Sequence, residues 1–206
     1  MSRTRPRLLL GAIALVAALA ITPVLRAAGP TAASPSAWTA DPARSTLEFT
    51  FVQAGAKSTG RFARFTANID FTAANPGAGR FDVNVDIGSV DTRDKDRDTQ
   101  LRAPELFDVM KFPRAQFEAG SFVAKGDTFE GSGKLTLRGV SRDVPLTFTF
   151  ATLTESGQPV AYLKGTATLK RLQFGVGQGE WKSTEWVEDD VQVAFDLRLQ
   201  PRAAKK

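Results

Sequence analysis

The sequence predicts a nearly all-β protein, an antiparallel barrel of about eight strands, and three observations support this. Apolar and polar residues alternate with period two along most of the 206-residue chain, which is typical of strands with one buried face. Turn-forming residues separate these runs. The apolar rows are rich in Phe, with 15 in the chain, and a closed barrel of this size can be filled by side chains or hold one ligand. A two-sheet sandwich is the alternative, because it would bury the same rows.

The first element is a predicted secretory signal peptide at residues 1–28. Three arginines between residues 3 and 7 precede an apolar run at residues 8–21. Pro23 interrupts this run before it reaches the roughly 20 residues that a membrane span needs. An uncleaved anchor reaching Leu25 is the alternative. Residues 29–36, GPTAASPS, are predicted to be a flexible linker. We therefore expect a periplasmic or secreted protein, cut between residues 27 and 33.

The mature chain is predicted to carry little net charge. The formal charge of +5 falls to about +1 once residues 1–28, with their four arginines and no acid, are removed. Residues 201–206 form a short basic tail. Without a broad cationic face to bind a phosphate backbone, nucleic acid is not an expected partner.

The predicted strands follow the linker and fill a single domain at residues 37–200. The alternating rows lie at residues 45–52, 63–71, 80–87, 135–137, 144–150, 161–169 and 191–199. Turn chemistry separates several of them, at Asn75-Pro76-Gly77, Gly126-Asp127, Gly139 and Ser156-Gly157. Tight turns between consecutive strands predict antiparallel neighbours.

Residues 91–112 depart from the alternation. The segment is charged at first and then places apolar residues at helix-like spacing, with Pro104 at a possible first helical turn. These apolar residues are Leu101, Leu106, Phe107 and Met110. We expect a loop with one or two short helices that closes the barrel.

Composition narrows the chemistry. The chain has no Cys and no His, which excludes disulfides, thiolate nucleophiles, Ser-His pairs and the usual Cys/His zinc sites. Acid-base chemistry would be left to carboxylates, lysines or Tyr162. The neighbouring acids at residues 188–190 would point to opposite faces of a strand, so a charged turn is the preferred interpretation.

One acidic run has the spacing of a calcium loop. Asp94, Asp96, Asp98 and Glu105 occupy positions 1, 3, 5 and 12 of such a loop. The sixth position requires Gly and holds Thr99. We therefore predict no metal site, and instead a solvated loop in which Asp98 or Thr99 caps a short helix.

The order of motifs resembles the YceI-like family. The matching motifs are Trp38 with Asp41, LEFTFVQAG at 47–55, GRF at 60–62, IGSVDTRDKDRD at 87–98, LRAPELFDVMKFPRAQF at 101–117, GKLTLRGVSRDVPL at 133–146 and RLQFGVG at 171–177. The resemblance implies a secreted, lipocalin-like antiparallel barrel that binds polyisoprenoid lipids, either polyprenyl phosphates or quinones. Many members carry a His after the first long strand, and this chain has none.

A second resemblance concerns residues 177–191, GQGEWKSTEWVEDDV. This stretch is similar to the family branch found beside, or fused to, di-haem b-type membrane cytochromes. The resemblance implies a prenyl quinone as ligand in preference to a polyprenyl phosphate, and a membrane b-type cytochrome as a partner.

Judged by residue type alone, the apolar rows form an ordinary core. The family resemblance implies in addition that some of these residues contact a lipid tail. The predicted tail contacts are Phe49, Phe51, Phe65, Phe71, Phe81, Phe117, Leu135, Leu137, Phe148, Phe150 and Phe195. The predicted headgroup donors are Arg138, Arg142 and Arg171, beside Trp181 and Trp186. Solvated strand-end charge is the alternative interpretation of these arginines.

We therefore expect a non-enzymatic periplasmic protein, without cofactor or metal, that holds an isoprenoid lipid in its barrel as carrier or store. A first alternative is a non-catalytic interaction module for a membrane b-type cytochrome, with a filled barrel and an exposed tryptophan patch. A second is an enzyme acting on a bound lipid, which would need a polar group with a shifted pKa buried among the Phe rows; Tyr162 or Glu48 inside the barrel would support it.

Overall fold

The computed structural model describes residues 37–202 of the chain. The predicted signal peptide and linker, and most of the predicted basic tail, lie outside these residues. Within residues 37–202, every helix is too short or too polar to cross a membrane.

The described residues form one twelve-stranded sheet, one α-helix and five 3₁₀ helices. The strands are β1 (Ala37–Ala40), β2 (Thr46–Gln53), β3 (Ala56–Phe62), β4 (Phe65–Asp70), β5 (Arg80–Asp86), β6 (Val90–Asp91), β7 (Arg114–Gly120), β8 (Val123–Lys125), β9 (Thr128–Leu137), β10 (Val140–Glu155), β11 (Gln158–Lys170) and β12 (Asp190–Pro201). The helices are α1 (Lys95–Arg102), η1 (Pro42–Arg44), η2 (Pro76–Ala78), η3 (Ile87–Ser89), η4 (Arg171–Phe174) and η5 (Gly179–Lys182).

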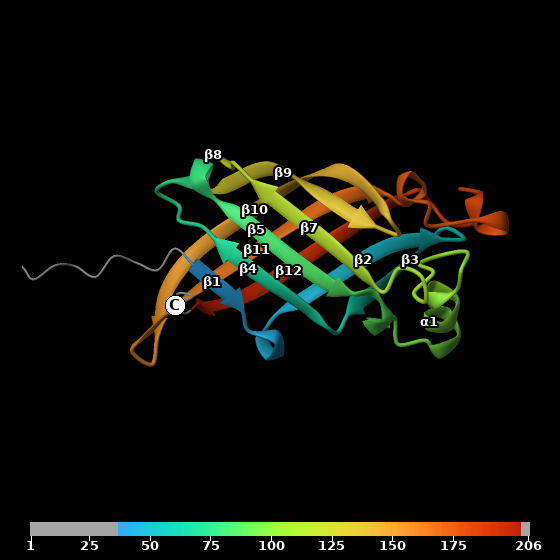
Figure 1. Ribbon diagram of the computed structural model, residues 1–206, viewed down its shortest axis with the longest axis horizontal. Coiled ribbons are helices and arrows are strands. Elements are labelled where there is room, and N and C mark those ends of the chain that lie inside the picture. The colour runs from blue at the N-terminus through green and yellow to red at the C-terminus, as the bar shows by residue number, and fades with distance from the viewer. Residues whose placement is uncertain (1–36, 203–206) are drawn as a thin grey trace, which may run out of the picture. The chain divides into compact units, whose positions relative to one another are not determined.

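Eight strands close into an antiparallel barrel, which confirms the predicted fold (Figure 1). Their order around the ring is β1-β4-β5-β7-β9-β10-β11-β12, and pairing of Trp38 with Pro201 returns the last strand to the first. One edge of β12 pairs with β1 near its end and with β2 over residues 192–196. The β2–β3 hairpin therefore continues the sheet beyond the closed ring.

Two-residue turns set the register of three hairpins. In each turn both residues have positive φ, as the type I′ turn requires, and Gly takes the second place because it adopts that backbone without a Cβ clash. The turns are Ala54-Gly55 (50° and 76°), Arg138-Gly139 (51° and 74°) and Ser156-Gly157 (49° and 79°). The first of these was not among the predicted turns. A fixed register keeps each predicted apolar row on the inner face of the barrel.

The segment at residues 91–112 contains the α-helix α1 at the right of Figure 1. Its cap is Asp94, whose Oδ1 accepts hydrogen bonds from the backbone N–H groups of Asp96 and Arg97, both at 3.1 Å. The prediction that Asp98 or Thr99 caps this helix is wrong. Asp94 has the extended backbone of a residue that precedes a helix, and this lets its side chain turn back to the first N–H groups. Asp98 and Thr99 lie within the helix and cannot do so.

After α1 the chain makes turns. Pro104 follows the helix and does not open a second one. Leu106 and Phe107 turn inward and are buried, whereas Met110 is 97% exposed. The helix-like spacing therefore placed Met110 wrongly, because the chain after α1 turns instead of continuing as a helix; Val109, not Met110, packs against the buried cluster beside Leu106 and Phe107.

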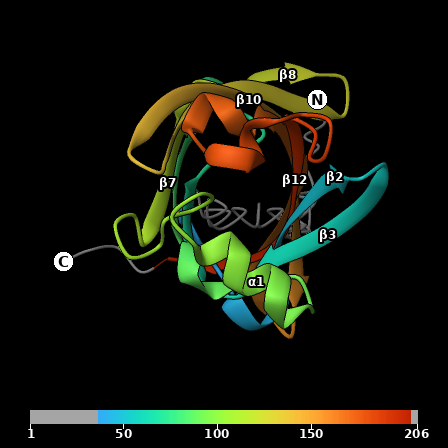
Figure 2. The same ribbon diagram turned by 90° about the vertical axis from the view of Figure 1, so that its right-hand side faces the viewer.

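The barrel interior divides into two clusters along its length. The filled end is the aromatic cluster of Trp38, Phe71, Phe81, Phe122, Phe129, Phe148 and Phe150. The hollow end lies under α1 and the segment at residues 171–187, and its buried residues include Phe49, Phe51, Phe107, Phe174 and Val187. Figure 2 looks along the barrel from the hollow end, with α1 on one side and the 171–187 segment on the other.

Candidate binding cavity

The hollow end encloses a cavity of about 230 Å³. In this measure one water molecule needs only about 10–15 Å³. The walls are the inward rows of the barrel strands, and nearly every lining side chain is aliphatic or aromatic. A cavity with such walls offers water no hydrogen-bond partners, so it favours an apolar guest.

Eight of the eleven predicted tail contacts line this cavity. They are Phe49, Phe51, Phe65, Phe81, Phe117, Leu135, Leu137 and Phe195. The other three, Phe71, Phe148 and Phe150, lie in the filled end and are not among the lining residues. Contact of any of these side chains with a ligand stays a prediction.

A glycine in the wall keeps the space open beside Phe49. This residue on β2 pairs with Gly60 on β3, and a Cβ at Gly60 would lie 2.4 Å from Cζ of the Phe49 ring. The ring therefore occupies the place that a side chain of β3 would take. It lies along the wall, where it leaves volume at the centre.

The filled end closes the cavity floor. Phe122, from the connection between β7 and β8, packs its ring 4.4 Å from that of Phe81 and 5.1 Å from that of Phe148, centroid to centroid. Gly79 and Gly131 make room for it, since a Cβ at either would lie within 2.6 Å of the Phe122 ring. The barrel is thus blind at this end, and a guest would enter from the other.

The helix α1 forms one side of the mouth. Asp98 accepts hydrogen bonds from the backbone N–H and the hydroxyl of Thr92, both at 2.8 Å. Arg102, one turn later, donates to the carbonyls of Gly88 and Val90. Because these two side chains fix one face of the helix against the β6 segment, a neighbouring face turns to the cavity. That face carries Arg97, Gln100 and Leu101, all of which line the cavity.

Arg171 holds the opposite side of the mouth. Its side chain is buried, and its five N–H groups donate to five backbone carbonyls. These belong to Val176, Trp181, Ser183, Val187 and Glu188, at 2.7–3.2 Å. Burial lowers the pKa of the Arg171 guanidinium, and the charge of Asp189 partly offsets this. Arg171 does line the cavity, but a headgroup could bind it only by displacing one of these carbonyls.

The other two predicted headgroup donors lie away from the cavity lining. Arg138 donates to the carbonyls of Pro104 and Leu106, at 2.6 and 2.5 Å, and so fastens the turn after α1. Arg142 is exposed and donates to the carbonyl of its neighbour Ser141. The fold therefore does not bring the three predicted arginines together, because two of them lie in or beside the outward Arg138-Gly139 turn.

The two tryptophans also separate. Trp181 is half-buried and lines the cavity, whereas Trp186 is 67% exposed. Sequence reasoning missed three polar lining residues, Gln53, Arg97 and Gln100. The i, i+3 spacing of the last two could have paired them on one helix face, had the helix bounds been known.

Tyr162 and Glu48, the two residues considered for the enzyme alternative, lie outside the barrel. The Tyr162 hydroxyl donates to Oε1 of Glu155 at 2.5 Å, and this hydrogen bond raises the pKa of Tyr162. Arg198 donates to the other oxygen of Glu155, at 2.7 Å. Glu48 is exposed on the outer row of β2. The inward row of β2 is apolar, since Leu47, Phe49 and Phe51 line the cavity.

The acidic runs have structural partners. Asp94 caps α1, and the buried Asp98 binds Thr92. At residues 188–190, Asp189 accepts from the backbone N–H of Leu172, and Asp190 forms an ion pair with Lys170 at 2.7 Å. Among the described residues, no group of three or more acidic side chains is arranged to hold a metal ion.

Comparisons with known proteins agree with this geometry. Residues 38–199 match the model of the YceI-like domain. A UPF0312 protein of Pseudomonas paraeruginosa is 35% identical over 133 residues, which cover 63% of this chain and 69% of that protein.

Solved structures show the same fold. BcnA of Burkholderia cenocepacia superposes with a TM-score of 0.72 at 31% identity, over 77% of this chain and 98% of that one. A polyisoprenoid binding domain from Saccharophagus degradans, implicated in plant cell wall breakdown, superposes with a TM-score of 0.63 at 17% identity. That match covers 82% of this chain and 99% of the other.

Proposed function

This chain belongs to the YceI-like domain family, and from this premise we propose that it is a periplasmic protein that binds an isoprenoid lipid as carrier or store. The observation that carries the proposal is the blind apolar cavity of about 230 Å³ at the hollow end. A similarly folded domain is described as polyisoprenoid binding, and the cavity found here suits that ligand class.

Hydrophobic burial would supply most of the binding energy. A prenyl tail has no strong hydrogen-bonding groups, so dry aliphatic and aromatic walls are sufficient to hold it. At about 0.3 kcal/mol per heavy atom, a 20-carbon tail would contribute about 6 kcal/mol, which corresponds to a Kd between millimolar and micromolar. Tighter binding would require additional free energy from contacts with the polar end of the lipid.

Location and role are part of the proposal. The predicted signal at residues 1–28 supports export, and a water-insoluble tail in the aqueous periplasm needs shielding. The proposed role is non-catalytic, since all but four of the lining side chains are apolar and Tyr162 and Glu48 lie outside the cavity.

The alternative is an interaction module for a membrane b-type cytochrome. The exposed Trp186 is the observation in its favour. Two features count against it as the main role: Trp181 lines the cavity instead of joining Trp186 in an exposed patch, and the barrel is not filled.

Native mass spectrometry of the protein purified from its own cells tests the proposal, followed by organic extraction of any released lipid. We expect a prenyl lipid bound one to one. A matched pair of variants separates the cavity from the surface: Ala167→Trp fills the cavity, and Ala151→Trp adds the same ring on the exposed outer face. Only the first should lose the lipid. A lipid-free protein that also ignores added geranylgeraniol would overturn the proposal and favour the interaction module.

A further inference from the structure

The polar groups at the mouth indicate which kind of headgroup the cavity takes; this inference rests on the proposed lipid binding. Four polar side chains line an otherwise apolar cavity: Gln53, Arg97, Gln100 and Arg171. Gln100 is exposed, so the cavity reaches the surface beside it. A lipid whose tail occupies the barrel would place its polar end among these groups.

Three of the four have donors to offer. Within the part of the chain that the structure describes, the side chains of Gln53, Arg97 and Gln100 make no hydrogen bond. The nearest charged contact of Arg97 is an ion pair with Asp94, at 3.6 Å, and its side chain is 32% exposed. Arg171 has no donor to spare, since five carbonyls already take all of its N–H groups.

The charges around these donors are balanced. Asp94 accompanies Arg97, and the charge of Asp189 acts on Arg171. Proteins that bind phosphate groups generally present unpaired arginines or lysines in a cluster. Here the ligand would face one partly paired cation and two amides. Together these groups supply many hydrogen-bond donors but little net charge. Such a set matches uncharged oxygen acceptors better than a multiply charged phosphate.

We propose that Arg97, Gln100 and Gln53 bind the polar end of the lipid, and that this end is an uncharged group with carbonyl acceptors, as in a prenyl quinone. The anchoring of α1 through Asp98 and Arg102 positions two of the three donors. A headgroup bound by these three side chains leaves the five hydrogen bonds of Arg171 intact.

The test uses three ligands that share a branched 20-carbon isoprenoid chain and differ at the head. They are phytane, which has no head, menaquinone-4, which has two quinone carbonyls, and geranylgeranyl diphosphate. Each displaces the apolar dye N-phenyl-1-naphthylamine from the purified protein. We expect all three to bind, with menaquinone-4 the tightest.

Two substitutions at the mouth identify the donors. Arg97→Met and Gln100→Leu remove hydrogen-bond donors and keep the side-chain length or volume. Each should weaken menaquinone-4 binding, by about tenfold for Arg97→Met, because it removes a charged donor. Phytane binding should stay unchanged, which also shows that the barrel is folded. Lys95→Met, an exposed position on the same helix, is the matched control and should change neither.

The outcomes are separable. If phytane and menaquinone-4 bind but Arg97→Met leaves both affinities unchanged, the headgroup site is wrong and the lipid cavity stands. If geranylgeranyl diphosphate binds more tightly than menaquinone-4 and loses most in Arg97→Met, the site is anionic and the proposed headgroup class is overturned. If none of the three ligands binds, the proposed function itself is wrong.

Discussion

The two ends of this barrel are built from the same residue types, yet one is solid and the other is hollow. At the filled end, Phe122 contacts rings contributed by several strands, and Trp38 is completely buried with its Nε1 donating to the carbonyl of Phe71 at 3.2 Å. At the hollow end, Phe49 and Phe51 are also buried but border a cavity.

Ring direction separates the two ends. Glycines appear in both, with opposite results: Gly79 and Gly131 let Phe122 enter the centre of the barrel, whereas Gly60 lets Phe49 lie along the wall. The lesson is that an aromatic-rich inner row does not show whether a barrel is filled. Whether the barrel is filled depends on whether each ring points into the centre of the barrel or packs against its wall.

The largest expected effect is on stability at the filled end. Phe148 packs against four other rings, so Phe148→Ala should lower the free energy of unfolding by about 3–5 kcal/mol. Phe51→Ala should cost about 2 kcal/mol or less, because one side of that ring faces empty space. Urea unfolding of both variants measures the difference. Equal losses would show that the hollow end is as tightly packed as the filled one.

The next effect should be confined to the hollow end. Arg171→Met leaves five backbone carbonyls without their donor, and the free energy of local opening there should fall by about 2–3 kcal/mol. Hydrogen exchange should accelerate at residues 172–187 and stay unchanged in β1, whose Trp38 and Ala40 belong to the filled end. Arg171→Lys should be intermediate, because an ammonium has three donors. Uniform acceleration would mean that the two ends unfold as one unit.

Acid should weaken the outer surface near the filled end. The hydrogen bond from Tyr162, followed by that from Arg198, holds the pKa of the Glu155 carboxyl below its usual range. A lowered pKa contributes stability above the unfolded-state value of about 4.3, and this is lost as pH falls through the folded-state pKa. Glu155→Gln should therefore be less stable at neutral pH and show a shallower loss below about pH 5. Unfolding free energies measured from pH 7 to pH 3 check this; parallel curves would contradict it.

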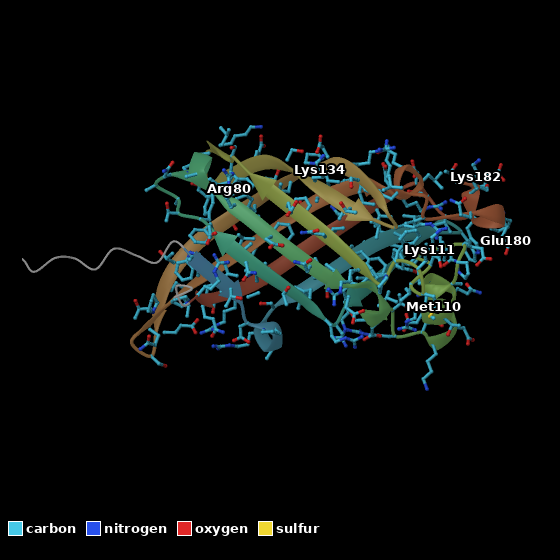
Figure 3. The ribbon with its side chains drawn as sticks, in the orientation of Figure 1. Arg80, Met110, Lys111, Lys134, Glu180 and Lys182 are labelled. Carbon is cyan, nitrogen blue, oxygen red and sulfur yellow. The ribbon has the colours of Figure 1, made fainter. Side chains whose placement is uncertain are left out.

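The smallest effect is expected at Met110, which projects from the turn beside α1 at the hollow end (Figure 3). At 97% exposure it contributes almost no packing, so Met110→Ser should change stability by no more than about 0.5 kcal/mol. Lipid content should also stay the same. A loss of bound lipid in this variant would mean that the rim takes part in loading, and that the hollow end extends beyond the cavity walls.

Much of the barrel could be predicted because strand patterning is local. Alternation with period two identified which residues of β5, β10 and β12 face inward, and turn residues such as Ser156-Gly157 predicted antiparallel neighbours. The cap of α1 was misassigned, because several acids at its start are equivalent in sequence and only backbone direction distinguishes Asp94.

The candidate site was less predictable, since it depends on contacts between distant segments. An arginine near a strand end looks the same in sequence whether it faces solvent, as Arg142 does near the start of β10, or binds five carbonyls, as Arg171 does directly after β11. The donors of Gln53 and Arg97 come from segments more than forty residues apart, and no local pattern links them.

The sequence by itself determined the class of fold and the apolar character of the interior, because both follow from residue alternation along single strands. Tertiary structure decided where the interior is empty, which end is open and which polar groups stand at the mouth. Those features depend on contacts between rings, glycines and side-chain donors from different strands. The alternation of residues along a single strand does not encode such contacts.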